Sequence, residues 1–356
     1  MKIALINDTH AGARGDNPLF NEYFFKFWEN TFFPYLEEHG IQKIVHLGDV
    51  VDRRKFINFV TLNSWRRRFF DVLEQKNISM DVIVGNHDVT YKNTNEINAM
   101  NELFERYNNI NVYTEPVMNE YAGTNIALIP WINSSNYEQS LQFMKDTPAQ
   151  ICFGHFEIAG FEMDRGNICH TGMNKETFDK FDVVLSGHFH HKSTDGNITY
   201  LGNQYQITWA DWGDDRGFHV FDTETRELTF VKNPYEMFHK ITYDDNTRDF
   251  EFWNMIDFEQ WKDCYVKIVV AHKQNPYLFD NVIDRLYKAG VADIAVVEDF
   301  TDSSVELDEE IINQAEDTMT ILNKYIDGLT LNVESVKLKN IMKELYIESL
   351  NVEVTE

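Results

Sequence analysis

The sequence has 356 residues, of which 43% are hydrophobic and 25% are charged. This is a normal globular balance, and the length suggests one large domain with one or two smaller ones. The net charge of −26 argues against a protein that grips nucleic acid through a basic surface of its own. Either the substrate is small, or bound metal ions and a partner supply positive charge.

The chain shows no sign of secretion or of membrane insertion. The three cysteines, Cys152, Cys169 and Cys264, form no C-x-x-C pair, which argues against a disulfide framework and predicts a reducing environment. In the N-terminal segment MKIALIND, the apolar run is too short for a signal peptide, and a charged residue follows it too early. No stretch approaches the ~18 apolar residues of a membrane span. We therefore expect a cytoplasmic protein without a membrane partner.

Short apolar runs alternate with helical patterns along the first part of the chain. Each run is rich in β-branched residues and ends at a small residue or asparagine, a pattern typical of buried strands. This alternation predicts an α/β domain with layered sheets. Strand-like segments at 198–208 and 217–231 look antiparallel, so we expect mixed sheets. The runs are IALIND, KIVHLGD, DVIVGNHD, QICFGHFE and DVVLSGHFHH, and the helical patterns lie near 20–39, 59–77, 94–107 and 136–146.

The pattern changes after a polar break near 233–249. Strand patterns at 265–271 and 292–299 flank a helical pattern at 276–289, which indicates a compact βαβ-like unit. From residue 307 onward, apolar residues recur every three or four positions and predict two amphipathic helices that need a cover. We predict three parts: a main domain over 1–235, a small α/β cap over 236–300, and a linker with C-terminal helices over 301–356.

Ligand-type side chains follow the predicted strands. Asp8 and His10 come directly after the first strand, and residues spaced i and i+2 point the same way in an extended chain. The others follow glycines, which permit the backbone turn that exposes each ligand. Because such residues converge at the carboxyl ends of strands in open α/β sheets, we expect one site. The other ligands are Asp49, Asn86, His155, His188 and His190.

The mix of ligand types predicts a site for two metal ions. Four histidines, two aspartates and one asparagine suit Mn²⁺, Fe²⁺ or Zn²⁺ rather than Ca²⁺. Seven ligands are too many for one ion but fit two ions that share a carboxylate. Two metals about 3.5–4 Å apart are a standard device for phosphate-ester hydrolysis, since they activate a water and neutralise charge on the phosphoryl oxygens.

Five motifs together carry a family resemblance: DTH (8–10), GDVVD (48–52), GNHD (85–88), GHFE (154–157) and GHFH (187–190). They resemble the calcineurin-like metallophosphoesterase superfamily. Within it, the chain is similar to the nuclease subunit of SbcCD/Mre-type DNA double-strand-break repair complexes, most of all to the tailed-phage recombination endonucleases. The resemblance implies a four-layer sandwich of two mixed β-sheets flanked by helices. It also implies an intracellular location, in the host cytoplasm if the chain is phage-encoded.

The resemblance also implies the role of each motif residue. His87 protonates the leaving 3′-oxygen or stabilises charge in the transition state, as suits the side chain that titrates near neutral pH. Asp88 orients His87 or a ligand. Asp52 stands where many relatives carry a histidine, and it completes the catalytic set. One metal would be bound by Asp8, His10 and His190. The other would be bound by Asn86, His155 and His188. Asp49 would bridge the two.

A substrate and partners follow from the same resemblance. It implies an exonuclease and endonuclease that uses two divalent ions, Mn²⁺ by preference, on single- and double-stranded DNA ends. The C-terminal helices would dock on an SMC-like coiled-coil ATPase, which would supply much of the grip on DNA. The main domain commonly dimerises in the family, and the aromatic segment 20–33 fits either a dimer face or core packing. Arg53 and Arg54 are expected to contact the phosphate backbone, and the resemblance implies that the cap over 236–300 binds DNA.

Two alternatives stay open at this point. The stretch GDVVDRR is similar to a motif of phosphoprotein phosphatases, so a phosphatase or a small-molecule phosphodiesterase of the same superfamily is one alternative. The motifs DTH, GNHD and GHFH argue against it. A non-catalytic assembly subunit that keeps the site only structurally is the other. The presence of every ligand and of His87 argues against that alternative.

Overall fold

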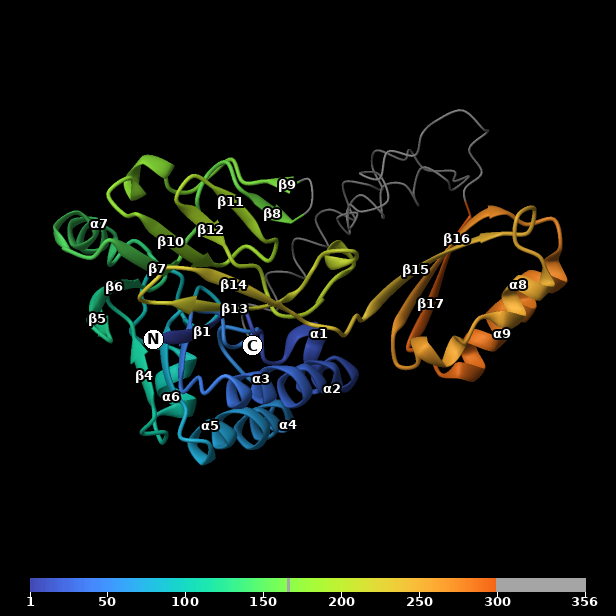
Figure 1. The fold of residues 1–356 in the computed structure, drawn as a ribbon, viewed down its shortest axis with the longest axis horizontal. Coiled ribbons are helices and arrows are strands. Elements are labelled where there is room, and N and C mark those ends of the chain that lie inside the picture. Colours follow the sequence, from blue (N-terminus) through green and yellow to red (C-terminus); the bar gives the residue numbers. More distant parts are fainter. Residues whose placement is uncertain (165–166, 299–356) are drawn as a thin grey trace, which may run out of the picture. The chain divides into compact units, whose positions relative to one another are not determined.

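Two six-stranded sheets form the centre of the computed structural model, which describes residues 1–164 and 167–298 (Figure 1). The first sheet runs in the order β14 (Leu228–Lys232), β13 (Gly217–Asp222), β1 (Lys2–Ile6), β2 (Lys43–His46), β3 (Ser79–Ile83) and β4 (Ile110–Tyr113). The second runs in the order β11 (Ser193–Asp195), β12 (Ile198–Tyr200), β10 (Val183–Gly187), β7 (Ile151–His155), β6 (Thr124–Ile129) and β5 (Val117–Tyr121). Both sheets mix parallel and antiparallel neighbours. The predicted α/β class with mixed sheets is therefore confirmed.

Alternation along the central strands divides the core into layers. Ile3 and Leu5 of β1 belong to the core between the sheets, together with Phe153 of the second sheet. Ala4 and Ile6 belong to the core between the first sheet and its helices. Both sheets therefore carry apolar side chains on two faces and are covered on both sides. The covering helices are α1 (Ala13–Asp16), α2 (Pro18–Phe27), α3 (Phe33–Glu38), α4 (Phe59–Trp65), α5 (Asp71–Gln75) and α6 (Ala99–Phe104) by the first sheet, and α7 (Tyr137–Asp146) with η3 (Lys175–Phe178) by the second.

The long helical patterns are confirmed near 20–39 and 59–77, but each contains a wider turn. Between α2 and α3 lies the π-helical turn η1 (Trp28–Phe32). The N–H of Phe33 reaches back to the carbonyl of Trp28, and the next residue, Pro34, has no N–H to donate. A second π-helical turn, η2 (Arg66–Phe70), joins α4 to α5. None of the helices in the described part of the chain has the length and apolar character needed to cross a lipid bilayer.

Two predicted elements are shorter in the structure. The helix expected near 94–107 is only α6, because the side chain of Asn98 accepts the N–H of Asn101 and caps the helix there. The strand expected over 198–208 ends with β12, since the buried residues beyond it bond to other segments, as Tyr205 does with the carbonyl of Thr9. Strands β4, β5 and β6 were not predicted. Two short strands, β8 (Glu162–Asp164) and β9 (Asn167–Ile168), pair in the loop after β7.

The aromatic residues of segment 20–33 pack in the core of their own chain. The ring of Phe24 stacks on Tyr205 with 3.8 Å between centroids. Trp28 contacts Phe32 and Phe69, each with centroids 4.9 Å away. Of the two possibilities for this segment, the structure therefore favours core packing for its aromatic side chains. The buried aromatic residues are Phe20, Phe24, Phe25, Phe27, Trp28, Phe32 and Phe33.

A third sheet lies in the predicted cap. Its strands β15 (Phe238–Asp244), β16 (Tyr265–His272) and β17 (Asp293–Glu298) are all parallel. Parallel neighbours need crossovers, which α8 (Phe250–Met255), η5 (Phe258–Trp261) and α9 (Pro276–Ala289) supply. Trp253, Val282 and Leu286 pack with Ile268 in a core of their own. The domain boundaries at 235 and 300 stay predictions, and the expected C-terminal helices lie outside the described residues.

The stacked pair of Phe24 and Tyr205 predicts a large effect on stability. Phe24→Ala should lower the free energy of unfolding by about 3–5 kcal/mol, because it removes a buried ring and leaves a cavity. Urea denaturation followed by circular dichroism would measure the change. Tyr287→Ala, on a side chain that is 64% exposed on α9, should stay within about 0.5 kcal/mol of the parent protein. Equal stability of the two variants would contradict the packing described here.

Candidate metal centre

The structure brings the predicted ligands together where strands of both sheets end. The ligand atoms of Asp8, His10 and His190 lie within 4.8 Å of one another. The same holds for those of Asp49, His155 and His188. The ligands come from the ends of β1 (Asp8, His10), β2 (Asp49), β3 (Asn86), β7 (His155) and β10 (His188, His190). The expected convergence on one crevice is thus what the structure shows.

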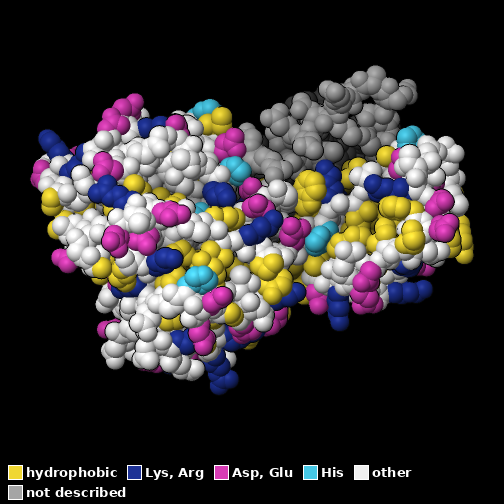
Figure 2. All heavy atoms as spheres, viewed as in Figure 1, with side chains coloured by type: hydrophobic (Ala, Val, Ile, Leu, Met, Phe, Trp, Pro, Cys, Tyr) yellow, Lys and Arg dark blue, Asp and Glu magenta, His cyan; other side chains and the backbone are white. Residues whose placement is uncertain are grey.

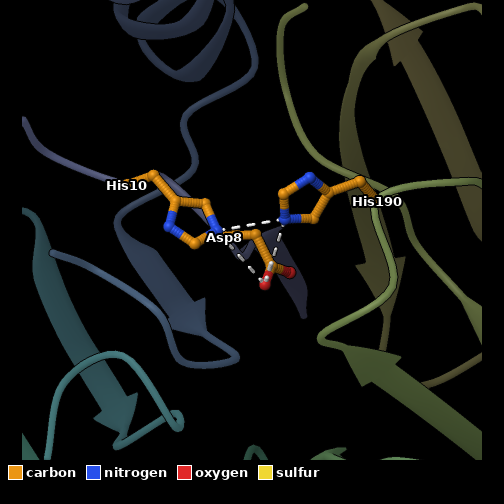
Figure 3. Close-up of side chains that lie close together, drawn as sticks. All are labelled: Asp8, His10 and His190. Atoms are coloured by element: carbon orange, nitrogen blue, oxygen red, sulfur yellow. Dashed lines mark hydrogen bonds and ion pairs between the residues drawn. The ribbon is translucent and has the colours of Figure 1, made fainter. Parts of the chain in front are cut away.

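The first group, drawn in Figure 3, brings together side chains that follow β1 and β10. Nε2 of His10 lies 3.0 Å from Nε2 of His190. These nitrogens lie 3.9 and 4.0 Å from Oδ1 of Asp8. The other ring nitrogen of His10 lies 3.4 Å from a carboxylate oxygen of Asp52, which is an ion-pair distance when the ring is protonated. Two imidazole nitrogens and one carboxylate oxygen converge as they would around a single cation.

The second group forms around His155. Its Nε2 lies 2.9 Å from Oδ1 of Asn86 and 3.3 Å from Oδ2 of Asp49. Its Nδ1 donates to the carbonyl of Leu47 at 2.7 Å, which fixes the proton there and leaves Nε2 as a donor to a cation. Ligand atoms of Asp49 also lie within 4.8 Å of those of His10 and His87. Asp49 therefore has the position that a shared carboxylate requires.

The electrostatics of the crevice favour cations. Asp8 and Asp49 are 0% and 2% exposed, and two buried carboxylates this close need positive charge nearby. Burial and Asp49 raise the pKa of Asp8. Burial opposes ionisation of Asp49 as well, but His155, His87 and His10 lower its pKa well below the usual value. Burial lowers the pKa of His188 to about 3, so that its imidazole is a neutral ligand.

Several ligands occupy a backbone conformation that is uncommon outside glycine. Asp8, His10, Asp49 and His188 have φ values of 47°, 44°, 58° and 87°. A tight turn of the backbone therefore brings Asp8 and His10 together. The expectation that they share a side of an extended chain is wrong. Hydrogen bonds to other loops hold this turn: Asp8 N–H donates to Gly48 O at 2.9 Å, and His188 N–H donates to Asp8 Oδ2 at 2.9 Å. Such conformations persist only where the surroundings enforce them.

Glycines in the motifs have two different roles. Gly48, at φ 92°, supplies the turn that was expected. Gly85 and Gly187 are required for close approach instead. A Cβ at Gly85 would lie 2.2 Å from Oδ1 of Asp49, and one at Gly187 would lie 2.8 Å from the carbonyl of Leu47. Any larger residue there would displace the ligand loops.

Asp88 holds the loops of the site rather than a reacting group. Its carboxylate accepts N–H bonds from Asp49 and Val50 at 2.8 Å, from Val51 at 3.1 Å and from Gly85 at 2.8 Å. It is 0% exposed, and its hydrogen-bond partners are backbone groups rather than the ring of His87. Of the two expected roles of Asp88, orienting His87 or orienting a ligand, these contacts fit the second, because its carboxylate clamps the loop of Asp49 to the loop after β3.

His87 lies beside both groups and is positioned through its main chain and its ring. Its backbone N–H donates to Asp49 Oδ1 at 2.7 Å, and its ring lies 4.9 Å from that of His10. Its Nδ1 lies 2.6 Å from the carbonyl oxygen of Asp52. Because a carbonyl can only accept, Nδ1 carries a proton and Nε2 is left to exchange one. Asp52 thus positions the ring of His87 by its carbonyl.

The two arginines expected at the phosphate backbone differ in their partners. Nη1 of Arg53 pairs with Asp16 at 3.1 Å, and its guanidinium lies 5.0 Å from the ring centre of Phe56. Nη1 of Arg54 is buried and has no hydrogen-bond partner within residues 1–164 and 167–298. Arg54 therefore has a buried donor that no described group satisfies, whereas Arg53 is already neutralised.

Three residues at the site were not singled out from the sequence. The ring of Trp131 lies 5.3 Å from that of His188, and Glu157 Oε2 lies 4.0 Å from His188 Nε2. Arg216, 5% exposed, donates to the carbonyl of His190 and to Asp211 at 2.7 Å. The apolar run IALIP before Trp131 is a usable signal, although it lacks the glycine and ligand of the other runs.

The match to known families agrees with this geometry. Residues 1–192 match the family model described as calcineurin-like phosphoesterase, and the chain belongs to this family. It is 30% identical to Exonuclease subunit 1 of Enterobacteria phage T4 over 352 residues, which cover 98% of this chain and 99% of that protein. The family resemblance of the motifs is therefore confirmed.

Two solved structures are similar at low identity. An archaeal phosphodiesterase aligns with a TM-score of 0.31 and 14% identity over 65% of this chain and 99% of that one. The nuclease MPE of Pseudomonas putida aligns with a TM-score of 0.28 and 17% identity over 64% of this chain and 87% of that one.

The clamp formed by Asp88 is testable through an isosteric change. Asp88→Asn should lower the free energy of unfolding by about 1.5–3 kcal/mol, because an amide cannot accept the full set of N–H bonds. It should also weaken Mn²⁺ binding by about 10–100-fold through the displaced Asp49 loop. Urea denaturation and titration calorimetry would measure these effects. Asp179→Asn, at an exposed position, is the matched control and should change neither. Mn²⁺ affinity equal to that of the parent would contradict the clamp.

Proposed function

We propose that this chain is a two-metal nuclease that hydrolyses phosphodiester bonds at DNA ends in recombination and repair, both as an exonuclease and as an endonuclease. The observation that carries the proposal is the convergence of two ligand groups on Asp49, with His87 beside both. The similarity to a protein named as an exonuclease subunit supports DNA as the substrate. Membership of the phosphoesterase family supports the reaction type.

The residues present suit two divalent cations, by preference Mn²⁺. Asp8, His10 and His190 would hold one ion, and Asp49 would be shared. Two bound ions would supply a water of lowered pKa and positive charge for the phosphoryl oxygens. The imidazoles and buried carboxylates form the mixed nitrogen and oxygen set that Mn²⁺ accepts. The second ion would be held by Asn86, His155 and His188.

His87 is the proposed proton donor to the leaving oxygen. The carbonyl of Asp52 holds the Nδ1 proton, so the ring is oriented and its Nε2 can transfer a proton. The N–H bond to Asp49 fixes the backbone of His87 relative to the shared ligand. Catalysis by this residue does not require Asp88 to touch it, which agrees with the clamp role of that carboxylate.

A partner subunit is part of the proposal. On the face in Figure 2, Lys and Arg side chains are interspersed with Asp and Glu, so this face offers no continuous basic surface for DNA. We propose that an SMC-like ATPase docks on residues 301–356, whose sequence predicts amphipathic helices. The name of the phage relative, a subunit, supports an assembly. An intracellular location is also proposed, supported by three free thiols.

We also propose that a second copy of the chain docks at the start of α4. Phe59 and Val60 are 86% and 74% exposed, and Phe56 beside them is 64% exposed. Adjacent exposed apolar side chains of this size mark interaction surfaces. This surface replaces segment 20–33, whose aromatic side chains are buried, as the proposed dimer contact.

The reaction is tested with the full chain and Mn²⁺. Fluorescent single- and double-stranded oligonucleotides should be cut, and chelation of the metal should stop the cleavage. His87→Ala should slow cleavage by about 10²–10⁴-fold while Mn²⁺ still binds, because only proton transfer is lost. His39→Ala, at an exposed histidine, is the control and should cut at the parental rate.

The outcomes separate the proposal from its rivals. Turnover of p-nitrophenyl phosphate but not of bis-p-nitrophenyl phosphate would favour a phosphatase. A chain that leaves DNA uncut, both alone and with its ATPase partner, would overturn the nuclease. Parental cleavage by His87→Ala would show that another group donates the proton.

The dimer contact has its own test. Phe59→Asp together with Val60→Asp should shift the protein toward the monomer in sedimentation velocity, because the charges would be buried without partners. Tyr287→Asp, at an exposed aromatic on α9, should leave the sedimentation coefficient unchanged. A parent protein that sediments as a monomer at tens of micromolar would rule the contact out.

A further inference from the structure

Two lysines face each other on the sheet of β15, β16 and β17. Lys240 of β15 lies directly opposite Lys267 of β16 in the strand register. Their neighbours Ile241 and Ile268 point into the core beneath the helices, so the lysines lie on the other face. Like charges directly opposite one another destabilise a sheet. The pair therefore requires an explanation beyond folding.

Each lysine rests on a tryptophan. Nζ of Lys267 lies 4.3 Å from the ring centre of Trp209, and Nζ of Lys240 lies 4.8 Å from that of Trp212. Both tryptophans belong to η4 (Trp209–Asp211) and the residue after it. Such contacts hold an ammonium in position without neutralising its charge. Burial, followed by the charge of Lys240, lowers the pKa of Lys267.

Neither ammonium has a neutralising partner in the part of the chain that the structure describes. The salt bridges of residues 1–164 and 167–298 include no carboxylate within 4.0 Å of Lys240 or Lys267. Within these ranges, the two ammonium groups therefore lie side by side without an ion pair, in a chain of net charge −26.

The lysines are connected to the metal centre through the same loop. Asp211, between the two tryptophans, pairs with Arg216 at 2.7 Å. Arg216 in turn donates to the carbonyl of His190, one of the expected metal ligands. The loop that supports the lysines is thus braced by the residue that holds His190 in place. These contacts link the position of the two ammonium groups to that of the metal centre.

We propose that Lys240 and Lys267, held on Trp212 and Trp209, bind a backbone phosphate of the DNA strand whose scissile diester lies at the metal centre. This inference rests on the proposed nuclease function. A phosphodiester fits because it presents a compact anion to two ammonium groups, and a strand offers further phosphates beyond the one that is cleaved. The contact would contribute affinity without sequence preference.

Salt dependence is the direct test. With His87→Ala as the background and Mn²⁺ present, a fluorescein-labelled single strand would be bound without cleavage and followed by anisotropy between about 50 and 200 mM salt. Lys240→Gln with Lys267→Gln should weaken binding and reduce the slope of log K against log salt by about 0.7 for each phosphate contact that is lost. Replacement of both lysines by arginine should retain the slope, because the charge is kept.

Lys288→Gln is the matched control, since Lys288 is exposed near the end of α9. Its slope should equal that of the parent. An unchanged slope in the double glutamine variant would overturn the inference, and so would tighter binding, which would show that the lysines neutralise acidic groups of the protein instead. Cleavage of DNA by the chain with its native His87, measured in parallel, distinguishes these failures from failure of the nuclease itself.

Discussion

Burial of two carboxylates in one crevice is the constraint on which this structure depends. Asp8 and Asp49 are almost without solvent, and each must be compensated by N–H groups or imidazoles. Those partners come from both sheets: the N–H of His188 reaches Asp8, and the ring of His155 lies against Asp49. The bond from His155 to the carbonyl of Leu47 joins the sheets at the same point. The contacts that compensate the charge are therefore also contacts that fix one sheet against the other.

The site was largely predictable from the sequence because its ligands are encoded locally. Each follows an apolar run, and parallel strands bring the ends of such runs to one edge. What the sequence did not reveal depends on contacts across long separations. Nothing near Asp88 shows that its carboxylate will collect N–H groups from the loop after β2. Trp131 was missed because its position is defined by His188, far along the chain, and not by a motif of its own.

The fold, like the site, was predictable where the signal is encoded locally in the sequence. Strands whose apolar run leads into a ligand residue, such as β7 and β10, were predicted. Neither β6, whose buried run IALI leads into no ligand, nor β5, exposed at alternate positions on a sheet edge, was predicted. An aromatic segment is equally compatible with a core or an interface, because periodicity shows that a face is apolar but not what covers it. Phe24 is core because Tyr205, in a segment expected to be a strand, turns inward to stack on it. Tertiary partners decide such cases.

The acidic composition and a polyanionic substrate are compatible because electrostatic effects are local. Exposed charges separated by more than about 8 Å are largely screened at physiological ionic strength. A strand at the metal centre would respond to the cations nearest to it more than to the net charge. Among the described cations, Asp211 neutralises Arg216 and Asp16 neutralises Arg53. Nη1 of Arg54 is buried without a hydrogen-bond partner among the described residues. The pair Lys240 and Lys267 remains without an ion pair. Discrimination against other anions would then come from the spacing of these few charges around the metals, and the remaining acidic surface would repel a strand that is not seated there.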